Sequence, residues 1–202
     1  MKKIMAALTA FAVLGFLAFT PVNEPLPLGS AIPKADVKLK DVSGKEKSLK
    51  ESMKPNGLLV MFSCNTCPVV KKYQSRTLEA AKQASTNQVG VVLLNSNEAY
   101  RGKGDGFSDM QVYAKEQGYD FNYLLDTKSA MADLFGALRT PEVFLFDGKG
   151  LLVYHGAIDD NSNDASGVTR KHLDIAISEL AAGKEISTKK TKSVGCGIKR
   201  PE

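Results

Sequence analysis

The stretch "LLVMFSCNTCPVVKKY", residues 58–73, indicates what lies at the centre of the fold. Its apolar part belongs to a continuous run over 57–63, which is what a strand buried on both faces of a sheet requires. From residue 66 to about residue 84 the sequence favours a helix. Cys64 and Cys67 therefore mark the point where a central strand gives way to a long helix.

The position of Cys64 predicts a reactive thiol. Backbone N–H groups in the first turn of a helix lack internal partners, and the helix dipole is positive there. Such surroundings lower a cysteine pKa from about 8.5 to about 3.5–7.5, and Lys71 and Lys72 would add to this effect if they lie nearby. The two-residue spacing brings Cys67 back towards Cys64, so we expect these two to form a disulfide. Pro68 fits the first helical turn, where its missing N–H costs nothing.

A zinc site and a purely structural disulfide are the alternative roles for the cysteine pair. Structural zinc usually takes its ligands from two close pairs, whereas the other soft ligands, Cys196, His155 and His172, are scattered along the chain. A structural Cys64–Cys67 bond would close a very short loop and stabilise little. A CxxC at a strand–helix junction instead favours thiol–disulfide exchange, so we expect no metal and no bound cofactor.

Strands and helices alternate along the rest of the chain. We expect a hairpin in 36–51, a strand in 88–97, a helix in 107–118, a strand in 121–126, a helix in 129–138, a strand pair in 142–156 and a helix in 168–183. The glycine-rich segment 101–106 is expected to be a loop at the rim of the active site. This order predicts an α/β fold with a mixed central β-sheet flanked by helices on both faces.

The N-terminal segment 1–20 has the pattern of a secretory signal. Lys2 and Lys3 form its basic start, and residues 4–19 carry no charge. An uncleaved anchor is the alternative, although 4–19 is shorter than the roughly 18 apolar residues of a spanning helix. In either case we expect an exported, periplasmic or otherwise extracytoplasmic protein, with 4–19 as the candidate membrane tether.

Composition suits one soluble domain behind this signal. Hydrophobic residues make up 43% of the chain and charged residues 24%, as in ordinary globular proteins. We expect an extended, proline-rich leader over 21–34, a domain over 35–184, and a polar tail over 185–202 that carries Cys196. The net charge of +5 comes from scattered lysines, which we attribute to solubility, so no nucleic-acid partner is expected.

Several of these motifs together resemble one family. They are "FSCNTCPVVKKY" (62–73), "LLNSNE" (93–98), "FNYLLDTKSAMADLFGALRTPEVFLFDGKGLLVYHGAIDD" (121–160) and "SVGCGIK" (193–199). Their order and spacing are similar to those of the thioredoxin-fold redoxins of the AhpC/TSA type, also called peroxiredoxin-like proteins. The resemblance covers roughly residues 28–199 and implies a thioredoxin-like fold with the CxxC at the start of the first long helix.

The resemblance also implies residue roles. Thr140 and Pro141 match the family's cis-proline turn, which faces the disulfide and whose neighbouring backbone pairs with a substrate chain. In thioredoxins the first cysteine attacks a disulfide and the second resolves the mixed disulfide, so the resemblance assigns attack to Cys64 and resolution to Cys67.

Peroxidase activity, with Cys67 as the peroxidatic cysteine, is the alternative within this family. True peroxiredoxins carry the motif P-x-x-x-T/S-x-x-C, and alignment on Cys67 places Cys64 at the Thr/Ser position and Val60 at the Pro position. The hydroxyl that would orient a peroxide is therefore missing. Pro141 stands nearest the register of the family's catalytic arginine, with Arg139 as a candidate substitute. Without a preorganised oxyanion site most of the rate advantage is lost.

Four further residues are candidates for accessory roles. Cys196, flanked by glycines, is a candidate third redox cysteine; an intermolecular disulfide and an inert thiol are its alternatives. Arg139 would favour a thiolate if it lies near the cysteines, and would otherwise be a solvated surface residue. Asn65 and Thr66 lie between the two cysteines.

We therefore predict an exported thioredoxin-like thiol–disulfide oxidoreductase that uses the Cys64/Cys67 dithiol. The alternatives are a thiol peroxidase and a non-catalytic metal-binding or redox-sensing protein. The expected partners are a protein or small-molecule disulfide or thiol substrate and an upstream thiol–disulfide electron donor.

Overall fold

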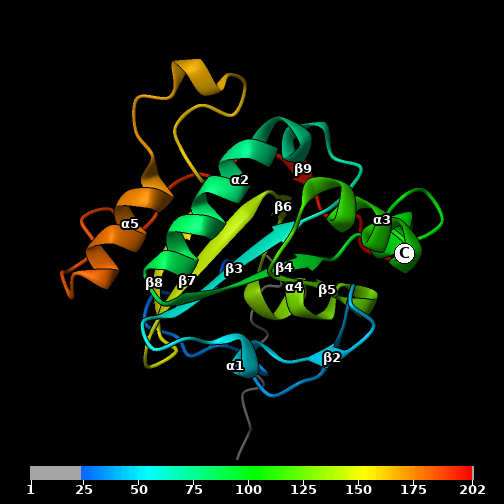
Figure 1. Cartoon of the computed structure of the whole chain (residues 1–202), viewed down its shortest axis with the longest axis horizontal. Coiled ribbons are helices and arrows are strands. Elements are labelled where there is room, and N and C mark those ends of the chain that lie inside the picture. The colour runs from blue at the N-terminus through cyan, green and yellow to red at the C-terminus, as the bar shows by residue number, and fades with distance from the viewer. Residues whose placement is uncertain (1–23, 202) are drawn as a thin grey trace, which may run out of the picture.

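A seven-stranded mixed sheet forms the centre of the structure, a computed structural model that describes residues 24–201 (Figure 1). Its strands are β1 (Leu39–Asp41), β2 (Glu46–Lys47), β3 (Gly57–Ser63), β4 (Val89–Asn95), β5 (Asn122–Leu125), β7 (Glu142–Asp147) and β8 (Leu152–Gly156). A separate two-stranded ladder joins β6 (Arg139–Thr140) to β9 (Cys196–Gly197). The predicted signal or anchor over 1–20 lies outside the described residues.

Five α-helices connect or follow these strands in the described part of the chain. They are α1 (Leu49–Ser52), α2 (Pro68–Thr86), α3 (Phe107–Gln117), α4 (Ala130–Phe135) and α5 (His172–Ala181). Short 3-10 turns lie at Glu98–Tyr100, Thr127–Ser129 and Ala165–Gly167. The helix α1 was not expected from the sequence; a capping box between Ser48 and Glu51 starts it. Within residues 24–201, no helix has both the length and the apolar character of a membrane span.

The sheet order is β2-β1-β5-β4-β3-β7-β8. The central strands β3, β4 and β5 are parallel, because α2 and α3 carry the chain back between them. The outer strands β7 and β8 form an antiparallel hairpin beside β3, and β1 pairs antiparallel with β5. The prediction of an α/β fold with a mixed sheet is therefore confirmed.

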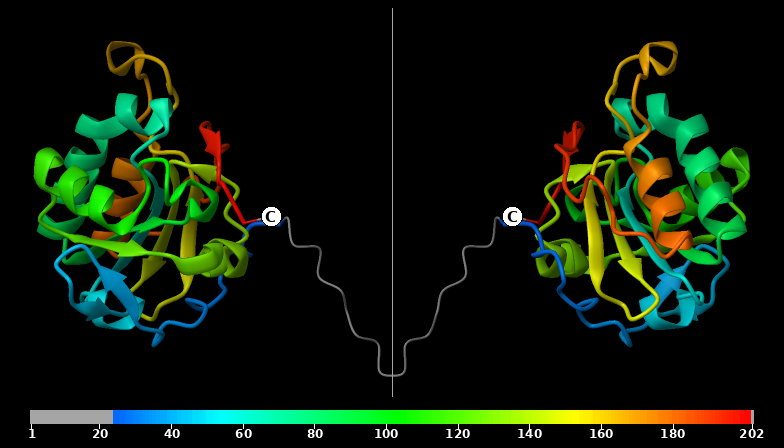
Figure 2. Two further views of the ribbon diagram at one scale, coloured as in Figure 1. Left: turned by 90° about the vertical axis from the view of Figure 1, so that its right-hand side faces the viewer. Right: turned by 90° about the vertical axis from the view of Figure 1, so that its left-hand side faces the viewer.

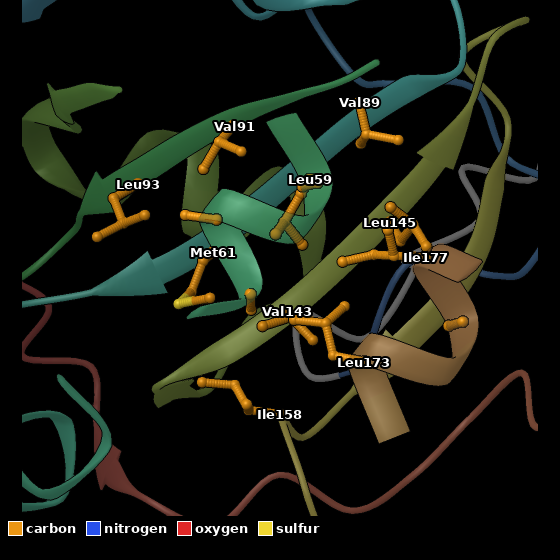
Figure 3. Packing of buried hydrophobic residues seen from close by; sticks show 14 of the residues in the cluster. Leu59, Met61, Val89, Val91, Leu93, Val143, Leu145, Ile158, Leu173 and Ile177 are labelled. Carbon is orange, nitrogen blue, oxygen red and sulfur yellow. The ribbon is translucent and has the colours of Figure 1, made fainter. Parts of the chain in front are cut away.

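Residues of β3 alternate between two buried layers. Leu59 and Met61 belong to the core cluster beneath α2, α3 and α5. Val60 and Phe62 belong to the cluster on the opposite face, which α1 and α4 cover. Figure 2 shows the helices on either side of the sheet, and Figure 3 shows Leu173 and the rest of α5 against β7. Each large side chain buried in this way stabilises the fold by about 1.5–3 kcal/mol.

The C-terminal tail folds back along the domain (red in Figure 2). Its backbone forms a bridge between Lys190 and His155, and β9 then pairs antiparallel with β6. Two apolar side chains of the tail, Ile186 and Ile198, are buried in the two cores. Its polar composition had indicated only a tail. Backbone pairing, which carries no compositional signal, holds it in place.

Candidate active site

Three segments meet beyond the carboxyl end of β3. They are the cysteine loop 64–67, the turn at 139–141 and the tail residues 195–197. Figure 1 places β9 beside β6 near the start of α2. The strand β6 is part of this turn, and β9 in the tail pairs with β6. This backbone pairing brings the tail to the cysteines.

The disulfide of the structure joins Cys67 to Cys196, with their Cα atoms 6.1 Å apart. Cys64 is a free thiol and is fully buried. The predicted Cys64–Cys67 bond is therefore not the one present. Cys196, the candidate third redox cysteine, is bonded to Cys67 within the same chain and is not a free thiol. The physical reason is the β6–β9 pairing, which sets Cys196 directly opposite Thr140; the carbonyl oxygen of Thr140 lies 3.4 Å from Cys67 Sγ.

The prediction of a lowered pKa at Cys64 is wrong for this state. Burial raises the pKa of the Cys64 thiol, and the negative charge of Asp105 raises it further. The hydroxyl of Thr140 and the backbone N–H groups of Cys67 and Thr66 act in the opposite direction. The N-cap of α2 is Cys67, so Cys64 lies in the loop three residues before the N-cap. Lys71 and Lys72 are both exposed, and the pKa of Cys64 is raised despite their positive charges.

The Thr140-Pro141 peptide bond is cis, as the resemblance implied. Thr140 is fully buried, and its hydroxyl oxygen lies 3.3 Å from Cys64 Sγ. Cys64 and Cys67 therefore both contact the same residue, one through its side chain and the other through its carbonyl oxygen.

The side chain of Glu142 holds this turn in place. Glu142 was not identified as a functional residue from the sequence. One carboxylate oxygen accepts the backbone N–H groups of Leu138 and Arg139, at 2.8 and 3.0 Å. The other oxygen lies 2.7 Å from Nε2 of His155, and both side chains are buried. An acidic residue directly after the Thr-Pro pair was the available signal, but its contact with His155 depends on the β7–β8 pairing.

Asp105 fixes the cysteine loop and is the second functional residue that was missed. Its buried carboxylate accepts the backbone N–H of Asn65 at 2.7 Å and the hydroxyl of Thr66 at 2.7 Å. The side-chain amides of Asn95 and Asn97 donate to the same carboxylate. The segment 101–106 thus borders the site as expected, and Asn65 and Thr66 are anchors of the cysteine loop.

Arg139 does not reach the cysteine sulfurs. Its side chain is exposed, and Nη1 donates to the carbonyl oxygen of Gly195 in the tail at 3.3 Å. Within residues 24–201, no arginine hydrogen-bonds to the sulfur of Cys64 or Cys67. In the same range, no group of His, Cys, Asp and Glu residues has an arrangement that could hold a metal ion.

Residues 28–155 match the family model described as the AhpC/TSA family. The chain belongs to the AhpC/TSA family. Comparison with curated proteins gave no match. The resemblance found in the sequence is confirmed by the family match.

Solved structures agree with this family assignment. An uncharacterized conserved protein from Geobacillus kaustophilus is 32% identical with a TM-score of 0.80, over 87% of this chain and 93% of that chain. A hypothetical protein from Sinorhizobium meliloti 1021 is also 32% identical with a TM-score of 0.80, over 88% and 97%. The thioredoxin domain of a thiol-disulfide oxidoreductase from Bacteroides vulgatus is 20% identical with a TM-score of 0.53, over 64% and 88%. The thioredoxin-like fold is therefore confirmed.

Two positions of the family's peroxidatic motif, as aligned in the sequence, carry other residues in this AhpC/TSA family member. Val60 lies within β3, and Cys64 is a free, buried thiol. Arg76 is buried, but its guanidinium pairs with Asp159 at 2.7 Å and stacks on a tyrosine ring. The site combines a buried thiol, a disulfide and the backbone of the cis-proline turn.

Proposed function

We propose that this AhpC/TSA family protein is a thiol–disulfide oxidoreductase that works through Cys64 and Cys67. The observation that carries this proposal is the shared contact with Thr140: Cys64 Sγ lies 3.3 Å from its hydroxyl oxygen and Cys67 Sγ lies 3.4 Å from its carbonyl oxygen. A free thiol therefore lies next to a disulfide at the cis-proline turn.

The reaction begins with the reduced protein. The Cys64 thiolate attacks one sulfur of a substrate disulfide, and the other substrate sulfur leaves as a thiolate. Cys67 then attacks Cys64 Sγ, releases the second substrate thiolate and forms the Cys64–Cys67 disulfide. The substrate has gained two electrons and the pair has lost two, so an upstream dithiol protein must restore them by the same exchange in reverse.

Two features support attack by Cys64. Burial raises the pKa of the Cys64 thiol, but the Thr140 hydroxyl and the backbone N–H groups of Thr66 and Cys67 act in the opposite direction and favour the thiolate. Among structural neighbours, the Bacteroides vulgatus domain belongs to a thiol-disulfide oxidoreductase, which is consistent with exchange chemistry on this fold.

Trapping of mixed disulfides tests the assignment. In the double variant Cys67→Ser/Cys196→Ser, only Cys64 remains, and we expect it to form a stable mixed disulfide with a scrambled disulfide substrate. In Cys64→Ser/Cys196→Ser, only Cys67 remains, and trapping should be much weaker. Stronger trapping by Cys67 would reverse the roles, and no trapping by either variant would remove the proposed function.

Thiol peroxidase is the second candidate, and one observation favours it. Cys67, at the peroxidatic position of the family motif, is bonded to the distant Cys196 in the manner of a resolving cysteine. Peroxide would oxidise Cys67 to a sulfenic acid, and the Cys196 thiol would condense with it, releasing water. Peroxide consumption with a thiol-regenerating system distinguishes this activity, which would persist in Cys64→Ser.

We further propose that the protein acts outside the cytoplasm, after export by the segment 1–20. The pattern of that segment and the presence of a disulfide both suit an oxidising compartment. Cell fractionation with detection of the mature N-terminus tests this, and recovery of the intact chain in the cytoplasm would contradict it.

A further inference from the structure

The tail occupies the backbone edge that borders the cysteines. In the β6–β9 ladder, Cys196 lies opposite Thr140 and Gly197 lies opposite Arg139. The N–H of Ile198 donates to the carbonyl oxygen of Leu138 at 3.0 Å and continues the ladder. An extended chain with a cysteine next to Cys67 is therefore already docked on β6 (Figure 1).

The docked segment fits only with a glycine before its cysteine. A Cβ atom added to Gly195 would lie 2.1 Å from the carbonyl oxygen of Thr140 and 2.7 Å from its carbonyl carbon. Those atoms are backbone of the turn and cannot move aside. A Cβ atom added to Gly197 would meet nothing within 4 Å, so the close approach is specific to the residue on the N-terminal side of Cys196.

The occupied edge also closes the site. Cys64 is fully buried and Cys67 is 3% exposed, and Cys196 packs against the small cluster that they form with Val70. While β9 is paired with β6, no second chain can pair with the same backbone groups. A substrate chain would have to displace the tail.

We propose that the tail is a built-in occupant of the substrate edge, held there by its bond to Cys67, and that transfer of this bond to Cys64 releases it. This inference rests on the proposed function. In the transfer, the Cys64 thiol loses its proton to solvent and its sulfur attacks Cys67 Sγ. The Cys64–Cys67 bond forms, the Cys67–Cys196 bond breaks, and Cys196 leaves as a thiolate that takes up a proton. No external oxidant or reductant is consumed.

Gly195→Ala and Gly197→Ala form a matched pair of full-length variants for the test. Each protein is equilibrated in a glutathione redox buffer, quenched with acid, alkylated and mapped by mass spectrometry. We expect Gly195→Ala to lower the ratio of Cys67–Cys196 to Cys64–Cys67 disulfide by at least about tenfold, because the added methyl group overpacks a backbone contact. Gly197→Ala should keep the wild-type ratio. Equal ratios in the two variants would overturn the proposal.

Substrate turnover gives the second readout. Reduction of a scrambled disulfide substrate should be faster in Gly195→Ala and in Cys196→Ser than in the wild type, because the β6 edge is then open. If Gly195→Ala fails to fold, as judged by circular dichroism, Cys196→Ser alone decides. An unchanged or slower rate would overturn the proposal. If every form lacks activity, the proposed function fails, while the disulfide ratios still report whether the tail is released by exchange.

Discussion

The carboxylate of Asp105 accepts the backbone N–H of Asn65 at 2.7 Å, although the two residues are far apart in the chain. This bond ties the loop that carries both cysteines to the loop that precedes α3. The same carboxylate accepts the hydroxyl of Thr66 and the amides of Asn95 and Asn97. The cysteines are thus held by a buried acid as well as by the start of α2.

Replacement of Asp105 by Ala should destabilise the fold by about 3 kcal/mol or more, because several buried donors lose their acceptor and each such loss costs about 1–3 kcal/mol. Urea denaturation measures this. The companion variant Asp105→Asn removes the negative charge that raises the pKa of Cys64, so that pKa should fall. A pH profile of Cys64 alkylation in which the pKa stays the same or rises would contradict the electrostatic part of the account.

The free thiol of the oxidised protein should react slowly at neutral pH. Burial raises the pKa of Cys64 above the ordinary value of a cysteine, so the thiol is protonated at pH 7 and only the rare thiolate reacts. The alkylation rate should climb by about tenfold per pH unit on approaching the pKa. Quenched-flow alkylation with mass spectrometry measures this rate, and fast, pH-independent labelling near pH 7 would contradict it.

Removal of the Thr140 hydroxyl should destabilise the thiolate form of Cys64. The hydrogen bond from this hydroxyl lowers the pKa of Cys64, so Thr140→Val should raise that pKa. The alkylation rate at pH 8 should fall by about tenfold, since a hydrogen bond to a charged group is worth about 1.5–3 kcal/mol. Thr140→Ser keeps the hydroxyl and is the control. Identical rates in the two variants would show that the contact has no effect on reactivity.

Loss of Glu142 should loosen the cis-proline turn. Glu142→Ala leaves the N–H groups of Leu138 and Arg139 and the ring of His155 without their hydrogen-bond partner. We expect a loss of about 3 kcal/mol in the free energy of unfolding, as when one partner of a buried pair is removed. Glu142→Gln retains an acceptor and should lose less. If both variants and the wild type have the same denaturant midpoint, Glu142 does not stabilise the turn.

The central strands were predictable because short stretches of neighbouring residues indicate that they are buried. The unbroken apolar run of β3 and the Asp147-Gly148 turn between β7 and β8 each specify an element from neighbouring residues. The partner of Cys67 was not predictable in this way. It lies 129 residues away, and it is selected by a ladder of very short strands, β6 and β9, that have no apolar pattern.

The candidate site shows the same division. The helix start and the cis-proline turn followed from motif and resemblance, and both are present. The pKa of Cys64 was predicted in the wrong direction, because the helix N-terminus is local whereas the burial of the sulfur is set by the whole fold. Asp105 was hidden in a glycine-rich loop, where composition indicates a turn but not a side chain that points inward.

Disulfide mapping of the fully reduced wild-type protein during oxidation by a substrate disulfide tests the central claim most directly. Cys64 is the attacking thiol in this account, so a Cys64–substrate mixed disulfide should form first and a Cys64–Cys67 bond should replace it. The Cys67–Cys196 bond should accumulate only afterwards. If Cys64 is found as a free thiol at every time point while the substrate is reduced, the account is contradicted.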